Sequence, residues 1–301
     1  MITQDSQVRL AAFDWLADRV SLHGEALPRT VLADGFNFQG TRVPLLGPQG
    51  IFKPKLCELP LSITTSPESP YDDTFSPDGL LAYRYRGDET QTGHHENVGL
   101  RRAMVEKTPL VYFHGLVPGQ YQALWPVFIV GDNLATLTFS VAVDDMTSAL
   151  GIDFGLSPAS VEVRREYITV LAKRRLHQEK FRAIVIQAYR ERCAICRLRH
   201  VNLLDAAHII DDRLPDGVST VQNGISLCKL HHKAYDTQIV GITPDYEVRI
   251  RGDILEESDG PTLEHGLKGM HGEPLTLPVR KEWWPDREKL EVRFERFRGA
   301  A

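Results

Sequence analysis

Four residues between positions 193 and 231 have the types and the spacing of a zinc site. Cys193 and Cys196 form a C-x-x-C pair, and Cys228 and His231 form a C-x-x-H pair further along the chain. Thiolates and imidazoles are the ligands of tetrahedral zinc, and two such pairs that meet at one point make a closed Cys3His site. A closed site stabilises a fold and has no open position for catalysis. We therefore predict a structural Zn²⁺ ion; the alternative is a pair of buried thiols near a surface histidine.

The next residue, His232, is not needed by the zinc pair and is available for other chemistry. If a helix starts near Cys228, His232 and Asp236 are four residues apart and lie on one face of it. An imidazole and a carboxylate in this arrangement can share one divalent ion. The stretch "NGISLCKLHHKAYD" therefore predicts a second metal site beside the first.

Two more polar residues lie between the zinc pairs. His208 ends the apolar stretch in "LLDAAHIIDD", and Asn223 stands just before the second pair. Each alone has a simpler interpretation, since a histidine can cap a strand and Asn223-Gly224 has the composition of a turn. Their joint order, His208, then Asn223, then His232, favours a hydrolytic site instead.

This order between two zinc pairs resembles the HNH endonucleases of the ββα-metal class. The likeness lies in "CAICRLRHVNLLDAAHI", in "NGISLCKLHHKAYD" and in "GPTLEHGLKGMHG", and it spans about residues 177–297. Within that class the chain resembles the McrA-like and type IV restriction endonucleases. The resemblance implies an enzyme that hydrolyses phosphodiester bonds of DNA.

The resemblance also implies a role for each matching residue. His208 would be the general base that takes a proton from the attacking water. Asn223 would fix the loop and orient that imidazole. His232 would bind the catalytic ion, Mg²⁺, Mn²⁺ or a similar divalent metal, which stabilises charge on the scissile phosphate. Asp236 is the expected second ligand and Asp205 the expected third.

One position departs from the family pattern. Many family members carry a metal-binding Asp or His directly before the base, and this chain has Ala207 there. The missing ligand must come from elsewhere. Asp205, Asp211 and Asp212 are the candidates, and Asp205 is the one that we assign.

The N-terminal half has the pattern of a different module. Residues 6–22 place apolar side chains at helical spacing. From about residue 27 to 145 the sequence changes to short runs rich in Val, Tyr and Phe, broken by Pro and Gly, which is typical of strands and turns. We expect a small barrel or a strongly curved sheet, with one helix at about 97–107.

Part of this half faintly resembles the SRA domains, PUA-like barrels that hold a flipped 5-methylcytosine. The likeness runs from "SPYDD" through "AYRYRG" to "KTPLVYF", although the family's glycine-rich segment is only "YRYRG" here. In that family aromatic rings sandwich the extruded base and a carboxylate accepts from its amine. The matching positions are Tyr71, Asp73, Tyr83 and Tyr85. The alternative is barrel filling, with one of the two strand tyrosines in the core.

Helical periodicity returns at residues 157–192, which lead directly into the first cysteine pair. The net charge is −5, but positions 164 to 199 hold eleven Lys or Arg against three Glu. A cationic band of this kind can bind phosphate, and a solvated helix face is the alternative. The residues that we assign to the DNA backbone are Lys173, Arg174, Arg175 and Arg182. A second charged helix is expected from about Asp286.

These patterns together predict an α+β fold. An SRA- or PUA-like curved β-barrel with helices would occupy residues 1–155, and a basic helical linker residues 156–192. A zinc-stapled ββα-metal HNH domain with a C-terminal extension would occupy residues 193–301. A length of 301 residues agrees with two domains.

The composition indicates the cellular location of the protein. No apolar run is long enough to span a bilayer, and the N-terminus lacks the pattern of a signal peptide, so we expect a cytoplasmic protein without membrane contact. Four cysteines, with only Cys57 apart from the cluster, do not make a disulfide scaffold.

The function that we predict is a modification-dependent endonuclease for double-stranded DNA, directed to a mark of the 5-methylcytosine type. We expect a homodimer, because each HNH site cuts one strand. One alternative is an HNH nuclease directed to phosphorothioate DNA or to structured RNA. The other is a non-catalytic, zinc-containing protein that binds nucleic acid.

Overall fold

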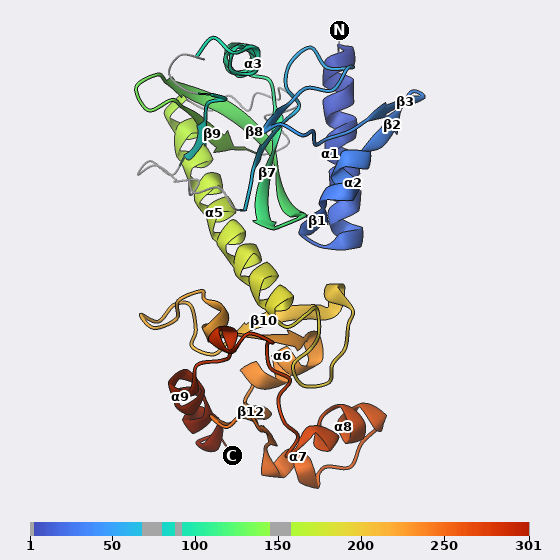
Figure 1. Cartoon of the computed structure of the whole chain (residues 1–301), viewed down its shortest axis with the longest axis vertical. Helices are drawn as coiled ribbons and strands as arrows, with labels where there is room; N and C mark the ends of the chain where they lie inside the picture. The colour runs from blue at the N-terminus through green and yellow to red at the C-terminus, as the bar shows by residue number, and fades with distance from the viewer. Residues whose placement is uncertain (1–2, 68–79, 88–91, 145–157, 301) are drawn as a thin grey trace. The chain divides into compact units, whose positions relative to one another are not determined.

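The computed structural model describes residues 3–67, 80–87, 92–144 and 158–300 (Figure 1). These residues form two compact units, Met1–Glu179 and Lys180–Ala301. The boundary lies inside the long helix α5 (Pro158–Ala188), within the range expected as a helical linker. None of the helices in the described ranges is both long and apolar enough to cross a membrane.

The first unit is built on a mixed sheet with the strand order β4-β5-β7-β8-β9-β6, and β1 also pairs with β8. Strands β5 and β7 are parallel, and the remaining pairs are antiparallel. Register shifts in β7 and β8 increase the local twist of these long strands. The strands are β1 (Ala26–Pro28), β4 (Ile51–Phe52), β5 (Ser62–Thr65), β6 (Leu81–Arg84), β7 (Leu110–Val117), β8 (Gln120–Asn133) and β9 (Thr138–Val143).

The sheet is an open half-barrel and not a closed barrel. Its edge strands β4 and β6 stand at opposite ends of the strand order and do not pair with each other in the described residues. The expected α+β class and the expected curvature are therefore confirmed, and closure of the barrel is not. A separate hairpin joins β2 (Phe36–Phe38) to β3 (Thr41–Val43), after the short helix α2 (Arg29–Asp34).

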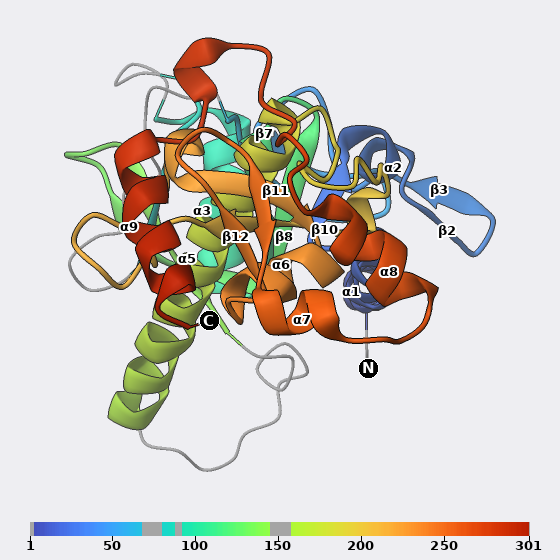
Figure 2. The same ribbon diagram turned by 90° about the horizontal axis from the view of Figure 1, so that it is seen from below.

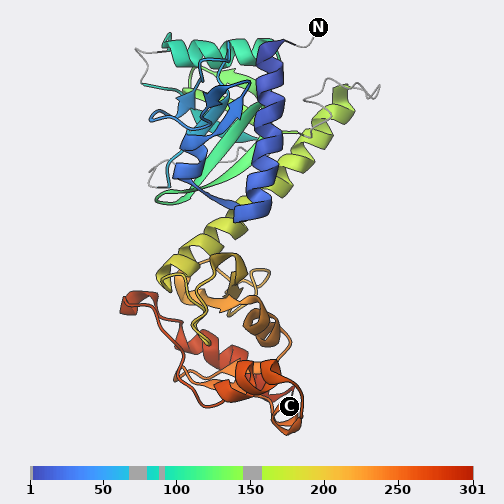
Figure 3. The same ribbon diagram turned by 90° about the vertical axis from the view of Figure 1, so that its right-hand side faces the viewer.

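Alternating side chains of the strands pack against different helices. Val111 and Phe113 of β7 belong to a core shared with α1 (Gln4–His23), whereas Tyr112 belongs to a second core that includes residues of α3 (His95–Val105) and α5. Figure 3 shows α1, in blue, lying along one side of the sheet. The helices expected at 6–22 and 97–107 are confirmed as α1 and α3.

The second unit begins with the apolar stripe of α5, because Phe181, Val185 and Ala188 are buried in its core. Strands β10 (Leu204–His208) and β11 (Gly224–Cys228) form an antiparallel pair, and α6 (Lys229–Asp236) contacts both (Figure 2). In this ββα arrangement the chain returns along β11, and α6 then packs beside β10. The arrangement therefore places the residues around 193, 208 and 232 near one another.

The remainder of the second unit packs around this motif. Strands β12 (Val240–Ile242) and β13 (Val248–Ile250) pair antiparallel. The expected charged helix is α9 (Arg287–Arg298), and the side chain of Asp286 caps it by accepting from two backbone amides. The other short elements are α7 (Gly252–Glu256), α8 (Pro261–Gly266), and the 3₁₀ turns η2 (Val201–Leu203), η3 (Val221–Asn223), η4 (Lys268–Met270) and η5 (Lys281–Trp283).

Candidate functional site

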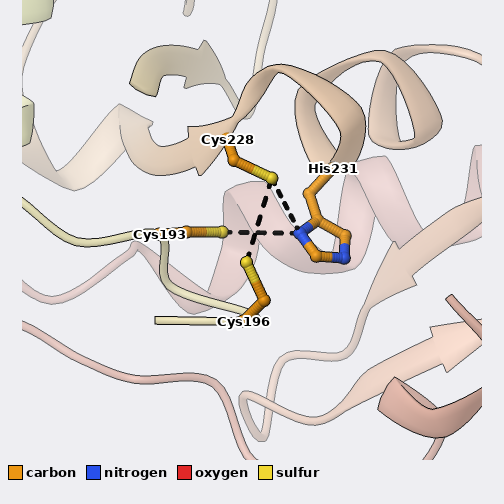
Figure 4. Close-up of side chains that lie close together, drawn as sticks. All are labelled: Cys193, Cys196, Cys228 and His231. Atoms are coloured by element: carbon orange, nitrogen blue, oxygen red, sulfur yellow. Dashed lines mark hydrogen bonds between the residues drawn. The ribbon is translucent and has the colours of Figure 1, made fainter. Parts of the chain in front are cut away.

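The four predicted zinc ligands converge. The sulfur atoms of Cys193, Cys196 and Cys228 and a ring nitrogen of His231 all lie within 4.8 Å of one another (Figure 4). Nδ1 of His231 is 3.5 Å from the sulfur of Cys193 and 3.1 Å from that of Cys228, and the sulfurs of Cys196 and Cys228 are 3.9 Å apart. Ligands of tetrahedral zinc with bonds of about 2.0–2.3 Å lie roughly 3.3–3.8 Å apart. The four side chains therefore fit zinc.

Local backbone structure brings each pair of ligands to this point. The amide of Arg197 donates to the carbonyl of Cys193, and Arg197 has the left-handed φ of 62° that the tight turn requires. Cys228 ends β11 and is the N-cap residue of α6, so that His231 follows within the first turn of the helix. The C-x-x-C spacing corresponds to this tight turn, and the C-x-x-H spacing corresponds to this helix start.

A partner outside the ligand set fixes the orientation of His231. Its Nε2 lies 2.7 Å from the carbonyl oxygen of Gly266, at the end of α8, and an N–H there donates to that oxygen. This leaves Nδ1 as the nitrogen that faces the three sulfurs. Metal-binding histidines are usually oriented by such a hydrogen bond. The segment "GPTLEHGLKGMHG" therefore supports the zinc cluster from outside.

His208 ends β10 and lies flat against an aromatic ring. Its imidazole and the ring of Phe181 have centroids 3.9 Å apart and planes 16° apart. Nε2 of His208 is buried and has no hydrogen-bond partner. Burial lowers the pKa of His208, and the nearby charges of Asp212 and Asp211 oppose this shift without cancelling it. Burial thus favours the neutral form of the ring, in which an unpaired nitrogen can accept a proton.

Gly224 makes this stacking possible, and sequence reasoning gave it no more than a turn. It pairs with His208 across the two strands. A Cβ at this position would lie 2.5 Å from a methyl of Val185 and 2.9 Å from the ring of Phe181. Phe181 lies within residues 157–192, for which the sequence predicts only a helix. Neither role has a sequence signal of its own.

Asn223 is fully buried and holds the loop that follows His208. Its Oδ1 accepts from the amide of Ile210 at 2.9 Å. Its Nδ2 donates to the carbonyls of Ile210 at 3.0 Å and of Val218 at 3.1 Å. The backbone carbonyl of Asn223 also accepts from the amide of Ile209 at 3.0 Å. One side chain thus fixes both ends of the loop.

His232 lies between two carboxylates. Its Nδ1 is 3.2 Å from Oδ2 of Asp205 in a hydrogen bond, and its Nε2 is 3.4 Å from Oδ2 of Asp236. The hydrogen bond to Asp205, together with the charges of both carboxylates, raises the pKa of His232. Burial alone would raise the pKa of Asp205, but the hydrogen bond and charge of His232 lower it. Carboxylate oxygens and an imidazole nitrogen are donors that divalent ions accept as ligands.

An arginine lies close to each of the two carboxylates, those of Asp205 and Asp236. Nε of Arg182, in α5, is 3.7 Å from Asp205, and Nη2 of Arg293, in α9, is 3.5 Å from Oδ1 of Asp236. Arg182 also donates to the carbonyls of Val201 and Leu204. Its guanidinium is thus engaged inside the second unit, and the phosphate contact expected of it stays a prediction.

Asp205, His232 and Asp236 do not form one three-ligand centre in this structure. Among the described residues, only the Cys3His cluster brings three candidate ligand atoms within 4.8 Å of one another. The imidazole separates the two carboxylates, one at each ring nitrogen. A single ion therefore fits beside His232 and one carboxylate.

The other predicted DNA contacts are spread over α5. Arg174 and Arg175 are exposed and Lys173 is half-buried. Arg175 forms an ion pair with Glu25. Lys173, Arg174 and Arg175 belong to the first unit, and their phosphate contacts stay a prediction.

The predicted base-binding residues do not assemble a pocket in the described residues. Tyr71 and Asp73 lie outside the described ranges. Tyr83 and Tyr85 are each 5% exposed and belong to the same apolar core, where the hydroxyl of Tyr85 donates to Asp132. The expectation that only one tyrosine is core is wrong, because residues two apart in an extended segment face the same side.

Residues 193–243 match the HNH endonuclease family model. No curated protein matches the chain. A solved structure described as a modification-dependent TagI restriction endonuclease is 18% identical, with a TM-score of 0.30, and the match covers 78% of this chain and 80% of that one. A second, the type IV phosphorothioation-dependent restriction endonuclease ScoMcrA, is 16% identical with a TM-score of 0.26, over 70% and 54% of the two chains. This chain thus spans about half the length of ScoMcrA.

Proposed function

We propose that this chain, an HNH-type DNA endonuclease, cuts modified double-stranded DNA with a divalent ion bound beside His232. The observation that supports this most is the unpaired Nε2 of His208. The charges of His232 and Asp236 both act on the pKa of His208, and this supports a base and an ion site that work together.

His208 takes the proton from the attacking water. A general base must be neutral at the working pH, and the lowered pKa of this imidazole favours that form. The ring of Phe181 fixes the plane of the His208 imidazole. The side chain of Asn223 fixes the loop that follows His208. Both residues keep Nε2 pointed at a constant position.

The ion ligands that we propose are Nε2 of His232 and Oδ2 of Asp236. Their separation of 3.4 Å suits two neighbouring ligands of one ion. Asp205 then accepts the Nδ1 proton of His232, because this contact has the geometry of a hydrogen bond. Mg²⁺ or Mn²⁺ there would stabilise charge on the phosphate and on the leaving oxygen. With two protein ligands, the remaining positions suit water and phosphate oxygens.

The Cys3His cluster has a structural role in this proposal. It fixes the start of α6 through Cys228 and His231, and His232 is the next residue of the same helix. Zinc bound there would hold His232 at a defined distance from β10. No step of the reaction needs that ion.

The first unit is the part that we propose to recognise the modification. The support is the sequence resemblance to SRA domains and the open, curled sheet, with 5-methylcytosine as the first candidate mark. Direct stacking by Tyr83 and Tyr85 is disfavoured because both are buried, so Tyr71 and Asp73 remain the proposed contacts. A phosphorothioate linkage is the second candidate. We also propose a homodimer, in which two sites cut the two strands, and phosphate contacts from Lys173 and Arg174.

A panel of four duplexes tests this function. Plain, 5-methylcytosine, 5-hydroxymethylcytosine and phosphorothioate versions of one sequence are incubated with the full chain in Mg²⁺ or Mn²⁺. The proposal expects cleavage of the 5-methylcytosine duplex well above that of plain DNA. Equal cleavage of all four overturns recognition by the first unit, and cleavage of only the phosphorothioate duplex selects the second mark.

A further inference from the structure

The C-terminal helix α9 reaches the proposed ion site through one side chain. Nη2 of Arg293 donates to the backbone carbonyl of Tyr235 at 3.1 Å and lies 3.5 Å from Oδ1 of Asp236. The guanidinium carbon is 4.6 Å from the centroid of the Tyr235 ring. The side chain is only 12% exposed, so it is held by the protein and not by solvent.

Helix α9 is itself firmly packed, and it can therefore act as a fixed support. Leu290 is fully buried and Phe297 nearly so. The ring of Phe297 lies so close to Gly241 in β12 that a Cβ there would come within 2.6 Å of it. Leu290 of α9 belongs to the same hydrophobic cluster as Ala234 and Tyr235 of α6, so α9 and the helix that carries the ligands share one core.

The segment around the start of α9 also contacts the loop that carries Asn223. The amide of Asp286 donates to the carbonyl of Gln222 at 2.9 Å, and the side chain of Gln222 donates to the carbonyl of Glu282 at 2.7 Å. Nζ of Lys289 donates to the carbonyl of Asp216 at 2.6 Å. The C-terminal segment thus supports the second unit on both sides of the proposed site.

Asp236 needs such a support because its side chain is half exposed. Arg293 contacts Oδ1, and Oδ2 is the atom that lies near Nε2 of His232. A carboxylate held at one oxygen presents the other in a fixed direction. Without the arginine, rotation of the carboxylate into solvent would take Oδ2 away from His232.

We propose that Arg293 is a positioning residue that orients Asp236 toward the catalytic ion, so that α9 is a working part of the nuclease module. This rests on the ligand pair proposed above. Charge and orientation have opposite effects on ion binding: removal of a cation beside the site would tighten a divalent ion, whereas loss of orientation would weaken it. Water around Asp236 screens the charge effect. Loss of an outer-shell partner typically costs about 10–100-fold in metal affinity.

The experiment measures Mn²⁺ binding directly, by the loss of the free-ion electron paramagnetic resonance signal, in the full-length, zinc-loaded protein. Arg293→Met should weaken binding by roughly 10-fold or more. Arg298→Met removes a charge from the same helix, where Arg298 pairs with Glu291 and Glu295 instead. This control should bind Mn²⁺ like the wild type. Asp236→Asn tests the ligand itself and should weaken binding at least as much as Arg293→Met.

The outcomes distinguish the proposed role of Arg293 from the proposed ligand pair, His232 and Asp236. Weak binding in Asp236→Asn with normal or tighter binding in Arg293→Met overturns the role of Arg293 and leaves the ligand pair intact. Normal binding in both variants overturns the ligand pair, and the role of Arg293 with it. If Arg293→Met does not fold, Arg293→Lys takes its place, because the lysine ammonium lies one bond short of the position of Nη2, the atom that contacts both Tyr235 and Asp236. Wild-type affinity in that variant also overturns the proposal.

Discussion

The imidazole of His208 lies flat on the ring of Phe181, with centroids 3.9 Å apart. Phe181 belongs to α5, the helix whose N-terminal part belongs to the first unit, whereas His208 ends β10. An apolar side chain therefore helps to orient the base of the proposed reaction. This contact covers one face of the imidazole, removes water from it and favours its neutral form.

The first prediction concerns pH. Because burial lowers the pKa of His208 below its usual 6.5, the neutral base persists as the solution becomes more acidic. The acid limb of kcat/KM for DNA cleavage should therefore have its midpoint below 6.5, measured at saturating Mn²⁺. Phe181→Leu keeps an apolar side chain but uncovers the imidazole, and it should move that midpoint upward. A midpoint above 6.5 in the wild type would contradict the assignment of His208.

The second prediction concerns zinc. Purified protein should contain one tightly bound zinc per chain, because the donor atoms fit one tetrahedral ion. Cys196→Ser should lose it and should lose the cooperative unfolding of residues 180–301 in calorimetry, since binding free energy at such sites is folding free energy. The transition of the first unit should remain. Cys57→Ala alters the one cysteine of the first unit and should retain zinc; zinc loss there would argue against the cluster.

The third prediction separates the two carboxylates beside His232. Asp236→Asn removes a proposed ligand and should abolish detectable activity at low Mn²⁺, with partial recovery at high Mn²⁺. Asp205→Asn keeps an oxygen that can accept the Nδ1 proton, so it should lower kcat more than it changes the Mn²⁺ dependence. Titration of the cleavage rate against Mn²⁺ checks both. The reverse pattern would make Asp205 the ligand and Asp236 the orienting group.

The zinc cluster could be predicted from sequence because its four ligands obey a local spacing rule. Both pairs are three residues apart, the separation set by one turn of backbone, and no long-range information is needed to recognise them. His208, Asn223 and His232 were selected by their order relative to the zinc pairs, and their roles were expected from the resemblance to the HNH endonucleases. The ββα fold was expected from the resemblance to the HNH endonucleases.

The supporting residues could not be predicted, because their contacts cross between distant segments. Arg293 is one of several arginines in a charged helix, and only the packing of α9 on β12 brings it to Asp236. Arg182 looks like a member of a basic band, yet it bonds to carbonyls of η2 and β10. Tyr83 and Tyr85 could not be assigned from sequence for a different reason. Aromatic residues suit both a base pocket and a core, and burial decides between them.

The measurement that tests this account most directly is plasmid nicking by His208→Ala. The variant should fall by about 10²–10⁴-fold in rate, the usual contribution of a general base, while its zinc content, melting temperature and DNA affinity stay close to those of the wild type. Asn202→Ala, an exposed position before β10, should cut normally. Nicking by His208→Ala at the wild-type rate, with zinc and fold intact, would contradict the proposed hydrolytic site.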